Sequence, residues 1–204
     1  MGLIAGGDGA LRRSSEGSED RPEEGERDLA AHDLAPRDAV VGIAASGRTP
    51  YVLGALAYAR RAGALTVALT CAAAAVPSPM AAAAEMAIEV ATGPEALTGS
   101  TRLKAGTATK LVLNSLSTGV MIRSGAVYGN LMVNVQTTNV KLVDRAERII
   151  AAATGCERDE AARLLEAGGT VKTAIAMKLR GIGRQEAEAL LERHGGRLGE
   201  ALGT

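Results

Sequence analysis

The chain is almost without aromatic side chains. Among its 204 residues there are three tyrosines, Tyr51, Tyr58 and Tyr128, and neither phenylalanine nor tryptophan occurs. A hydrophobic core must therefore be built from Ala, Leu, Val, Ile and Met. Surfaces that hold nucleic-acid bases use several aromatic rings for stacking, so this composition excludes stacking on bases or sugar rings as the main mode of recognition.

Cysteine and histidine are equally scarce. Cys71 and Cys156 are too isolated to form a disulfide framework or a metal site, which favours a reducing, cytoplasmic location. Cys71 ends an apolar run, so we expect it to be packed and not nucleophilic. His32 and His194 have no metal-ligand pattern around them. We expect His32 on the surface and His194, beside two glycines, at a helix C-terminus, and we expect no metal.

An excess of one charge and a long apolar run are also missing. Lys plus Arg and Asp plus Glu number 23 each, which argues against a nucleic-acid-binding surface. The first residues lack the basic segment and apolar core of a signal peptide. The alanine-rich run from Ala62 to Ala91 is broken by Pro77, Pro79 and Glu85, so it does not predict a membrane span. We expect a soluble protein.

What the sequence does contain is an alternation of short apolar runs with helical patterns, which is typical of parallel βαβ units in an α/β protein. The predictions for the first part of the chain are strands at 3–5, 38–45, 65–71 and 86–90, helices at 50–62 and 105–124, and an extended segment at 130–135.

The pattern becomes wholly helical near Asp144. Helices are predicted at about 139–154, 157–167, 171–180 and 184–194. In two of them a pair of leucines precedes a glycine, which is a preferred helix end. We therefore expect two domains, 1–140 and 141–204, of which the second is a small helical bundle.

The most informative segment joins the strand at 38–45 to the helix that Pro50 opens. It is Ser46-Gly47-Arg48-Thr49, which places two hydroxyls and a cation at a helix N-terminus. Unpaired backbone N–H groups and the helix dipole make such an end suitable for a phosphate. The alternative is an ordinary capped strand–turn–helix junction.

A second segment of this kind spans residues 98–107, ahead of the long helix. Its hydroxyls and cations include Ser100, Thr101 and Lys104. The alternative here is a capped helix entry with solvated cations. Because loops that follow parallel strands converge at the carboxyl edge of the sheet, the two segments together favour a phosphorylated small molecule as ligand.

Acidic residues gather at 16–33. Glu16 and Glu19 are three apart, so they would share a face if this segment were helical. Paired carboxylates raise each other's proton affinity and can supply a general base. The alternative is a solvated surface loop, which we expect for residues 23–33.

These segments together resemble the N-acetylmuramic acid 6-phosphate etherases, bacterial lyases built on the sugar isomerase (SIS) domain. The resemblance rests on residues 2–7, 16–20, 40–52, 98–107, 110–119, 129–133, 153–156 and 194–196. It implies a three-layer α/β/α SIS fold with a parallel sheet, followed by a small ubiquitin-associated-like (UBA-like) helical subdomain.

The resemblance also implies a reaction. The family cleaves the D-lactyl ether of N-acetylmuramic acid 6-phosphate to N-acetylglucosamine 6-phosphate and D-lactate during cell-wall recycling, without a metal or organic cofactor and as a homodimer. Glu19 matches a catalytic carboxylate of the family's Glu-Gly-x-Glu-Asp motif. The residues that match its substrate-binding segments are Glu16, Ser46, Gly47, Arg48, Thr49, Ser100, Thr101 and Lys104.

The family pattern also has elements ahead of Leu3, among them a first strand, a glycine-rich loop and a second catalytic glutamate. We therefore expect residues 1–204 alone to be inactive as an etherase and poorly folded over the first hundred residues. The alternative functions are a non-catalytic phosphosugar-binding regulator, like the glucokinase regulatory protein, and a sugar-phosphate isomerase, which the Glu-Gly-x-Glu-Asp match disfavours.

Overall fold

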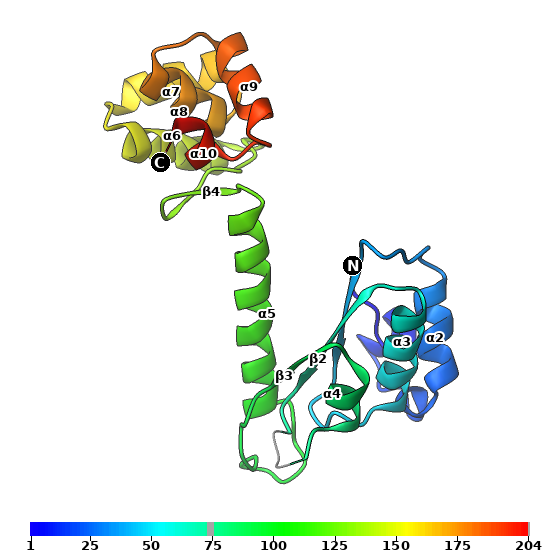
Figure 1. Ribbon diagram of the computed structural model, residues 1–204. Coiled ribbons are helices and arrows are strands. Elements are labelled where there is room, and N and C mark those ends of the chain that lie inside the picture. The colour runs from blue at the N-terminus through cyan, green and yellow to red at the C-terminus, as the bar shows by residue number, and fades with distance from the viewer. Residues whose placement is uncertain (73–75, 204) are drawn as a thin grey trace. The chain divides into compact units, whose positions relative to one another are not determined.

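The computed structural model describes residues 1–72 and 76–203, which form two compact units, Met1–Leu113 and Asn114–Thr204 (Figure 1). Residues 73–75, part of the alanine-rich run, lie outside the described residues.

A parallel sheet forms the centre of the first unit. Its strands are β1 (Ala39–Ile43), β2 (Leu65–Thr70) and β3 (Met86–Glu89), in the order β1-β2-β3. Both strand pairs are parallel. Three of the four predicted strands and the α/β class are thereby confirmed.

Helices α3 (Pro50–Arg61) and α4 (Pro79–Ala83) cover one face of this sheet. Leu56 of α3, Ala68 of β2 and Met80 of α4 pack together there and are fully buried. The predicted helix at 50–62 is confirmed, and its Pro50 occupies the first turn, where a missing N–H loses no hydrogen bond.

The sequence predicts a solvated surface loop at residues 23–33, and this prediction is wrong for most of the segment. Residues Pro22–Ala30 form helix α2, which packs against α3. Its buried residues, Gly25 and Leu29, are four apart and so share a face, while Glu23 and Arg27 are exposed. The charge run is the solvated side of an amphipathic helix.

The predicted strand at Leu3–Ala5 is wrong. These residues lie in no strand; instead, the N–H of Gly7 donates to the Ile4 carbonyl in a turn. Gly6 and Gly7 have φ of 83° and 66°. These left-handed values turn the chain and end any extended segment, and α1 (Gly7–Ala10) follows at once.

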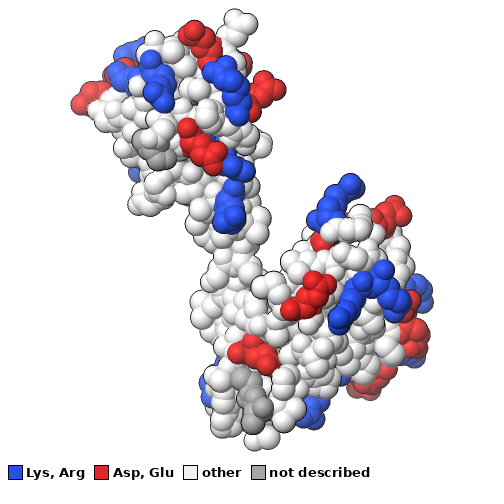
Figure 2. All heavy atoms as spheres, in the orientation of Figure 1, with Lys and Arg blue, Asp and Glu red and all other residues white. Residues whose placement is uncertain are grey.

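Helix α5 (Lys104–Arg123) matches the predicted long helix and has an unusual surface. Its only buried residue is Ala105. The large apolar side chains that it exposes are Leu111, Leu113, Leu116, Val120, Met121 and Ile122. In Figure 2 the visible surface along α5 is nearly free of charged side chains. No helix in the described part of the chain combines the length and the hydropathy that a membrane crossing requires.

The second unit is a helical bundle after a short hairpin. After the last part of α5, its elements are β4 (Val127–Tyr128), β5 (Leu131–Met132), α6 (Val140–Thr154), α7 (Arg158–Gly168), α8 (Val171–Arg180), α9 (Arg184–Arg193) and α10 (Leu198–Leu202). Four of these helices were predicted, and α10 was not. Ile150, Ile175 and Leu198 are fully buried in its core, which shows that α10 completes the bundle.

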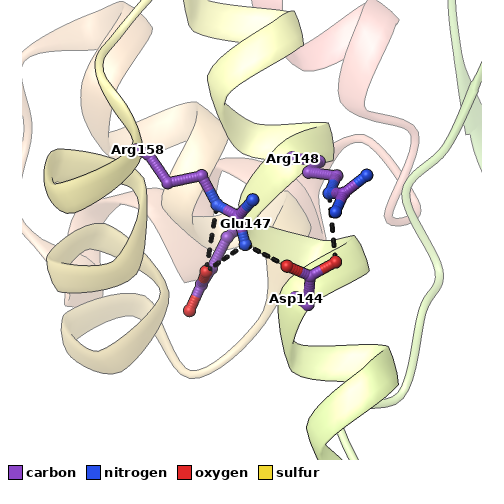
Figure 3. A network of polar contacts seen from close by, with 4 residues as sticks. All are labelled: Asp144, Glu147, Arg148 and Arg158. Carbon is purple, nitrogen blue, oxygen red and sulfur yellow. Dashed lines mark hydrogen bonds and ion pairs between the residues drawn. The ribbon is translucent and has the colours of Figure 1, made fainter.

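An ion-pair network links α6 to the start of α7 on the surface of this bundle (Figure 3). The Arg158 guanidinium donates to the carboxylates of Asp144 and Glu147, and Arg148 donates to the other oxygen of Asp144 at 3.0 Å. The Arg158 hydrogen bond lowers the pKa of Asp144. All four side chains are partly solvated, so the network stabilises the bundle only modestly.

Candidate functional site

The segment Ser46–Thr49 lies between the carboxyl end of β1 and the first turn of α3, as predicted. Ser46 and Arg48 are exposed, and the Ser46 Oγ accepts the Arg48 N–H at 3.3 Å. The local fold is set by Gly47, which has φ of 67°. A Cβ at Gly47 would lie 2.5 Å from the Ser78 side chain, so both its conformation and its surroundings require glycine.

The N-terminus of α3 is open. Thr49 is its N-cap residue, yet the Thr49 side chain accepts no capping hydrogen bond. Thr170 at the start of α8 and Asn139 at the start of α6 do accept such bonds, from Thr173 and Leu142. The hydroxyl of Thr49 and the first N–H groups of α3 are therefore available to an outside acceptor.

The floor of this segment is formed by Ser78 and Thr70. The Met80 N–H donates to the Gly47 carbonyl at 3.0 Å, and Ser78 caps α4. Thr70, at the carboxyl end of β2, is fully buried next to Gly47, and its hydroxyl has no hydrogen-bond partner among the described residues. Sequence reasoning missed both residues, because their role depends on packing between strands and not on a local motif.

Glu16 and Glu19 do not share a helical face, and the alternative of a solvated surface segment agrees with the exposure of both residues. Between them Gly17 adopts φ of 73°, which breaks the helix and leaves Glu16 in a turn. Glu19 lies in the short helix η1 (Ser18–Asp20), which contacts α3. Glu19 is exposed. The contact between η1 and α3 connects it to the helix that follows the Ser46–Thr49 segment.

The second predicted segment has a different geometry. The carboxylate of Glu95 accepts the N–H groups of Lys104 and Ala105, both at 2.9 Å, and so closes the N-terminus of α5. These two N–H donors lower the pKa of Glu95. No hydrogen bond joins the side chains of Ser100, Thr101 or Lys104 to another described residue. The segment can offer a ligand these side chains but not the first N–H groups of its helix.

Glu95 is a second residue that the sequence did not reveal. It lies nine positions before Lys104, which is outside the three-residue spacing of a capping box. No signal in the sequence distinguishes it from a solvated glutamate.

The histidines and Cys71 lie where they were expected. His32 is exposed, and His194 is the C-cap residue of α9. The Cys71 sulfur is half-buried, 3.5 Å from the Ala105 carbonyl and 3.6 Å from the Thr109 hydroxyl. Within 1–72 and 76–203, no group of three His, Cys, Asp or Glu residues could hold a metal ion.

Comparison with known proteins identifies the family. Residues 1–60 match the model of the glucokinase regulatory protein N-terminal SIS domain. Over 203 residues, 99% of its length, the chain is 58% identical to N-acetylmuramic acid 6-phosphate etherase from Serratia proteamaculans and covers 67% of that relative. The chain belongs to the N-acetylmuramic acid 6-phosphate etherase family.

Two further etherases support the assignment. Those of Pectobacterium atrosepticum and Cronobacter sakazakii are each 56% identical over 99% of the chain. The chain spans about two thirds of the length of these relatives, 66% and 67%. The etherase family and the SIS domain both agree with the resemblance drawn from the sequence.

Proposed function

We propose that this protein takes part in cleaving the D-lactyl ether of N-acetylmuramic acid 6-phosphate to N-acetylglucosamine 6-phosphate and D-lactate, in amino sugar recycling. The observation that carries the proposal is the 58% identity to an etherase along 99% of the chain. The open N-terminus of α3 supports it, because such an end suits the phosphate of a phosphorylated sugar.

The phosphate belongs at the Ser46–Thr49 segment. In our proposal the hydroxyls of Ser46 and Thr49, the loop at Gly47 and the cation of Arg48 hold it. Glu16, Ser100, Thr101 and Lys104 contact other parts of the substrate. Charge-assisted hydrogen bonds of this kind fix both the position and the orientation of a phosphate.

Glu19 is the proposed general base. In the open-chain aldehyde form of the sugar, the carbonyl acidifies the proton at C2. The carboxylate of Glu19 takes this proton, a C2–C3 double bond forms, and the C3–O bond breaks. Lactate leaves with its oxygen after receiving a proton, and water then adds at C3 to give the product. The elimination of lactate and the addition of water leave the overall oxidation state unchanged, so the proposed reaction needs no redox cofactor, and the family resemblance implies neither a metal nor an organic cofactor.

The test uses a chimera in which the part of the Serratia relative that this chain does not span is joined to the chain. We expect the chimera to release D-lactate from the substrate. A general base contributes roughly 10²–10⁴-fold, so Glu19→Gln should lower kcat by a factor in that range and leave phosphosugar affinity nearly unchanged. Glu23→Gln is the matched control, because Glu23 is a nearby exposed carboxylate that lies outside the Glu-Gly-x-Glu-Asp motif. An unchanged kcat in Glu19→Gln would remove Glu19 from the mechanism.

A second candidate function is phosphosugar binding without turnover. The match of residues 1–60 to the SIS domain of the glucokinase regulatory protein favours it. The same chimera separates the two functions. Saturable binding of the phosphosugar in calorimetry, without D-lactate release, would support the regulator and contradict the etherase.

We further propose a homodimer. The stripe Leu113, Leu116 and Val120 of α5 is exposed and follows helical spacing, so a second copy of the chain could bury it. Light scattering coupled to size exclusion should show a dimer, and Leu116→Glu should shift it to a monomer. A wild-type monomer would contradict this proposal.

The remaining architecture is also part of the proposal. We propose that the sheet is the core of a three-layer α/β/α SIS domain over residues 1–140, and that residues 141–204 form a UBA-like subdomain. The compact bundle of α6 to α10 supports the second assignment. The free thiols of Cys71 and Cys156 fit a cytoplasmic location.

A further inference from the structure

Helices α2 and α3 touch through their backbones at two glycines. A Cβ on Gly25 would lie 1.9 Å from the Tyr51 carbonyl oxygen, and a Cβ on Gly54 would lie 1.9 Å from the Pro22 carbonyl oxygen. Both glycines are buried, and neither has a positive φ. They are therefore required by lack of space and not by backbone conformation.

This double contact lies at the ends of the helices that carry the proposed site. Pro22 and Tyr51 belong to the first turns of α2 and α3. Helix α2 begins two residues after Asp20, the last residue of η1, and α3 begins directly after Thr49. Figure 1 shows the two helices side by side. The contact thus joins the segment of Glu19 to the Ser46–Thr49 segment.

A hydrogen bond between side chains holds the same pair of helices. The buried Tyr51 hydroxyl donates to the Asp28 carboxylate at 2.9 Å. Burial and this carboxylate raise the pKa of Tyr51 to about 12, because both favour the protonated phenol that donates the hydrogen bond. Further along, Arg61 of α3 pairs with Glu26 of α2 at 2.5 Å. Both partners on α2 follow Gly25, and the Arg61–Glu26 pair is exposed, so the Tyr51–Asp28 hydrogen bond is the side-chain contact that supports the crossing.

We infer that Gly25 and Gly54 are positioning residues, and that their lack of a side chain sets the separation between the Glu19 carboxylate and the phosphate-binding segment. The inference rests on the proposed function. Real Cβ atoms do not approach other atoms closer than 3.0 Å. Alanine at either position would thus force a backbone shift of about 1 Å, the difference between 3.0 and 1.9 Å. A misplacement of about 1 Å can lower a rate roughly 10²-fold.

The test is to measure kcat, KM and thermal unfolding for Gly25→Ala and Gly54→Ala in the chimera. Gly9→Ala is the matched control, because a Cβ at Gly9 meets nothing within 4 Å. We expect each of the first two variants to lose about 100-fold in kcat, with KM changed by less than about fivefold. The phosphate segment itself remains intact in these variants. The control should keep wild-type kinetics.

The comparison of kcat with KM separates positioning from a merely structural role. A role in stability alone would lower the unfolding temperature and leave kcat per folded molecule unchanged, and that result would overturn the inference. So would a rise in KM at constant kcat.

If neither alanine variant folds, Tyr51→Phe decides, because it removes only the hydrogen bond between the helices. It should lower kcat about threefold to tenfold at constant KM, and wild-type kcat would refute the inference. A wild-type chimera that releases no D-lactate refutes the proposed function and, with it, this inference. Turnover that survives in Gly25→Ala and Gly54→Ala refutes the inference alone.

Discussion

Helices α3 and α5 both begin after a strand of the same sheet and behind a segment rich in hydroxyls and cations, but their N-termini differ. At α5 the N–H groups of Lys104 and Ala105 are taken by the carboxylate of Glu95. At α3 the N-cap residue Thr49 makes no cap. The protein fills one anion-binding end with its own carboxylate and leaves the other open. An open helix end behind a suitable loop is therefore the stronger indication of a phosphate site.

The comparison of α3 with α5 predicts that substitutions at the open N-terminus of α3 have the largest effects on phosphosugar binding. Ser46→Ala and Thr49→Val should each weaken binding of N-acetylmuramic acid 6-phosphate about tenfold to more than 100-fold, because a hydrogen bond to a charged group contributes about 1.5–3 kcal/mol. Calorimetry on the chimera measures this. Thr170→Val, which changes an N-cap threonine in the helical bundle, is the matched control and should bind like wild type. Wild-type affinity in both loop variants would place the phosphate elsewhere.

The buried hydroxyls beneath the open end give a second contrast. Thr70 and Thr66 are both fully buried on β2, but Thr66 accepts the Glu85 N–H at 3.0 Å and Thr70 has no described partner. Leaving a buried polar group unpaired costs about 1–3 kcal/mol. Thr70→Val should therefore raise the free energy of unfolding by up to that amount.

Thr66→Val provides the opposite case, because it would leave the Glu85 N–H without its acceptor. It should lower the free energy of unfolding by about 1–3 kcal/mol. Urea titrations of both variants give the sign directly. Equal destabilisation by the two substitutions would mean that the Thr70 hydroxyl is satisfied in solution.

The sequence predicts much of the fold and part of the candidate site. Local patterns predicted the parallel strands, helix α3 and most of the bundle, because alternation, glycine stops and Pro50 act over a few residues. They also located Ser46–Thr49. They failed at Leu3–Ala5, where apolar residues suggest a strand but no described strand pairs with them. They also failed at α2, where the many charged residues suggest a loop although Gly25 and Leu29 form a buried face.

The missed features of the site have one physical cause. Glu95, Thr70 and the pair Gly25–Gly54 matter because of what lies next to them across the fold. Glutamate nine residues before a helix, or glycine in the middle of one, carries no local signal of its partner. The sequence shows which donors a loop supplies, but only the structure shows which of them are already used.

A smaller effect is expected from the two N-cap threonines. Thr170 accepts the Thr173 N–H at 3.1 Å, and its loss should lower the free energy of unfolding of the bundle by about 1 kcal/mol. Thr49 caps nothing, so Thr49→Ala should change stability by less than about 0.5 kcal/mol. Denaturant titrations of Thr170→Ala and Thr49→Ala test this pair. A loss of about 1 kcal/mol in both variants would show that Thr49 caps α3 in solution and that this end is closed.

The smallest effect concerns the closed end, and it depends on pH. The N–H groups of Ala105 and Lys104 hold the pKa of Glu95 below its ordinary value. Folded protein therefore binds fewer protons at Glu95 than unfolded protein does, so stability falls as acid is added. The contribution is fully present above the ordinary carboxyl pKa and is lost as the pH falls through the lowered value. Water screens the Glu95 carboxylate, so we expect its protonation to affect the first turn of α5 and to change the stability of the whole protein little.

The measurement is an NMR titration of the Lys104 and Ala105 amide protons. Both signals should move together with the Glu95 carboxyl, at a pH below the ordinary titration range of a glutamate. Glu95→Gln should abolish the shift, since an amide oxygen accepts a hydrogen bond but does not titrate. Glu85→Gln, at an exposed glutamate elsewhere in the unit, should leave it unchanged. If the two amide signals instead stay constant in wild type while Glu95 titrates, the carboxylate does not close α5, and both helix ends would be open to an anion.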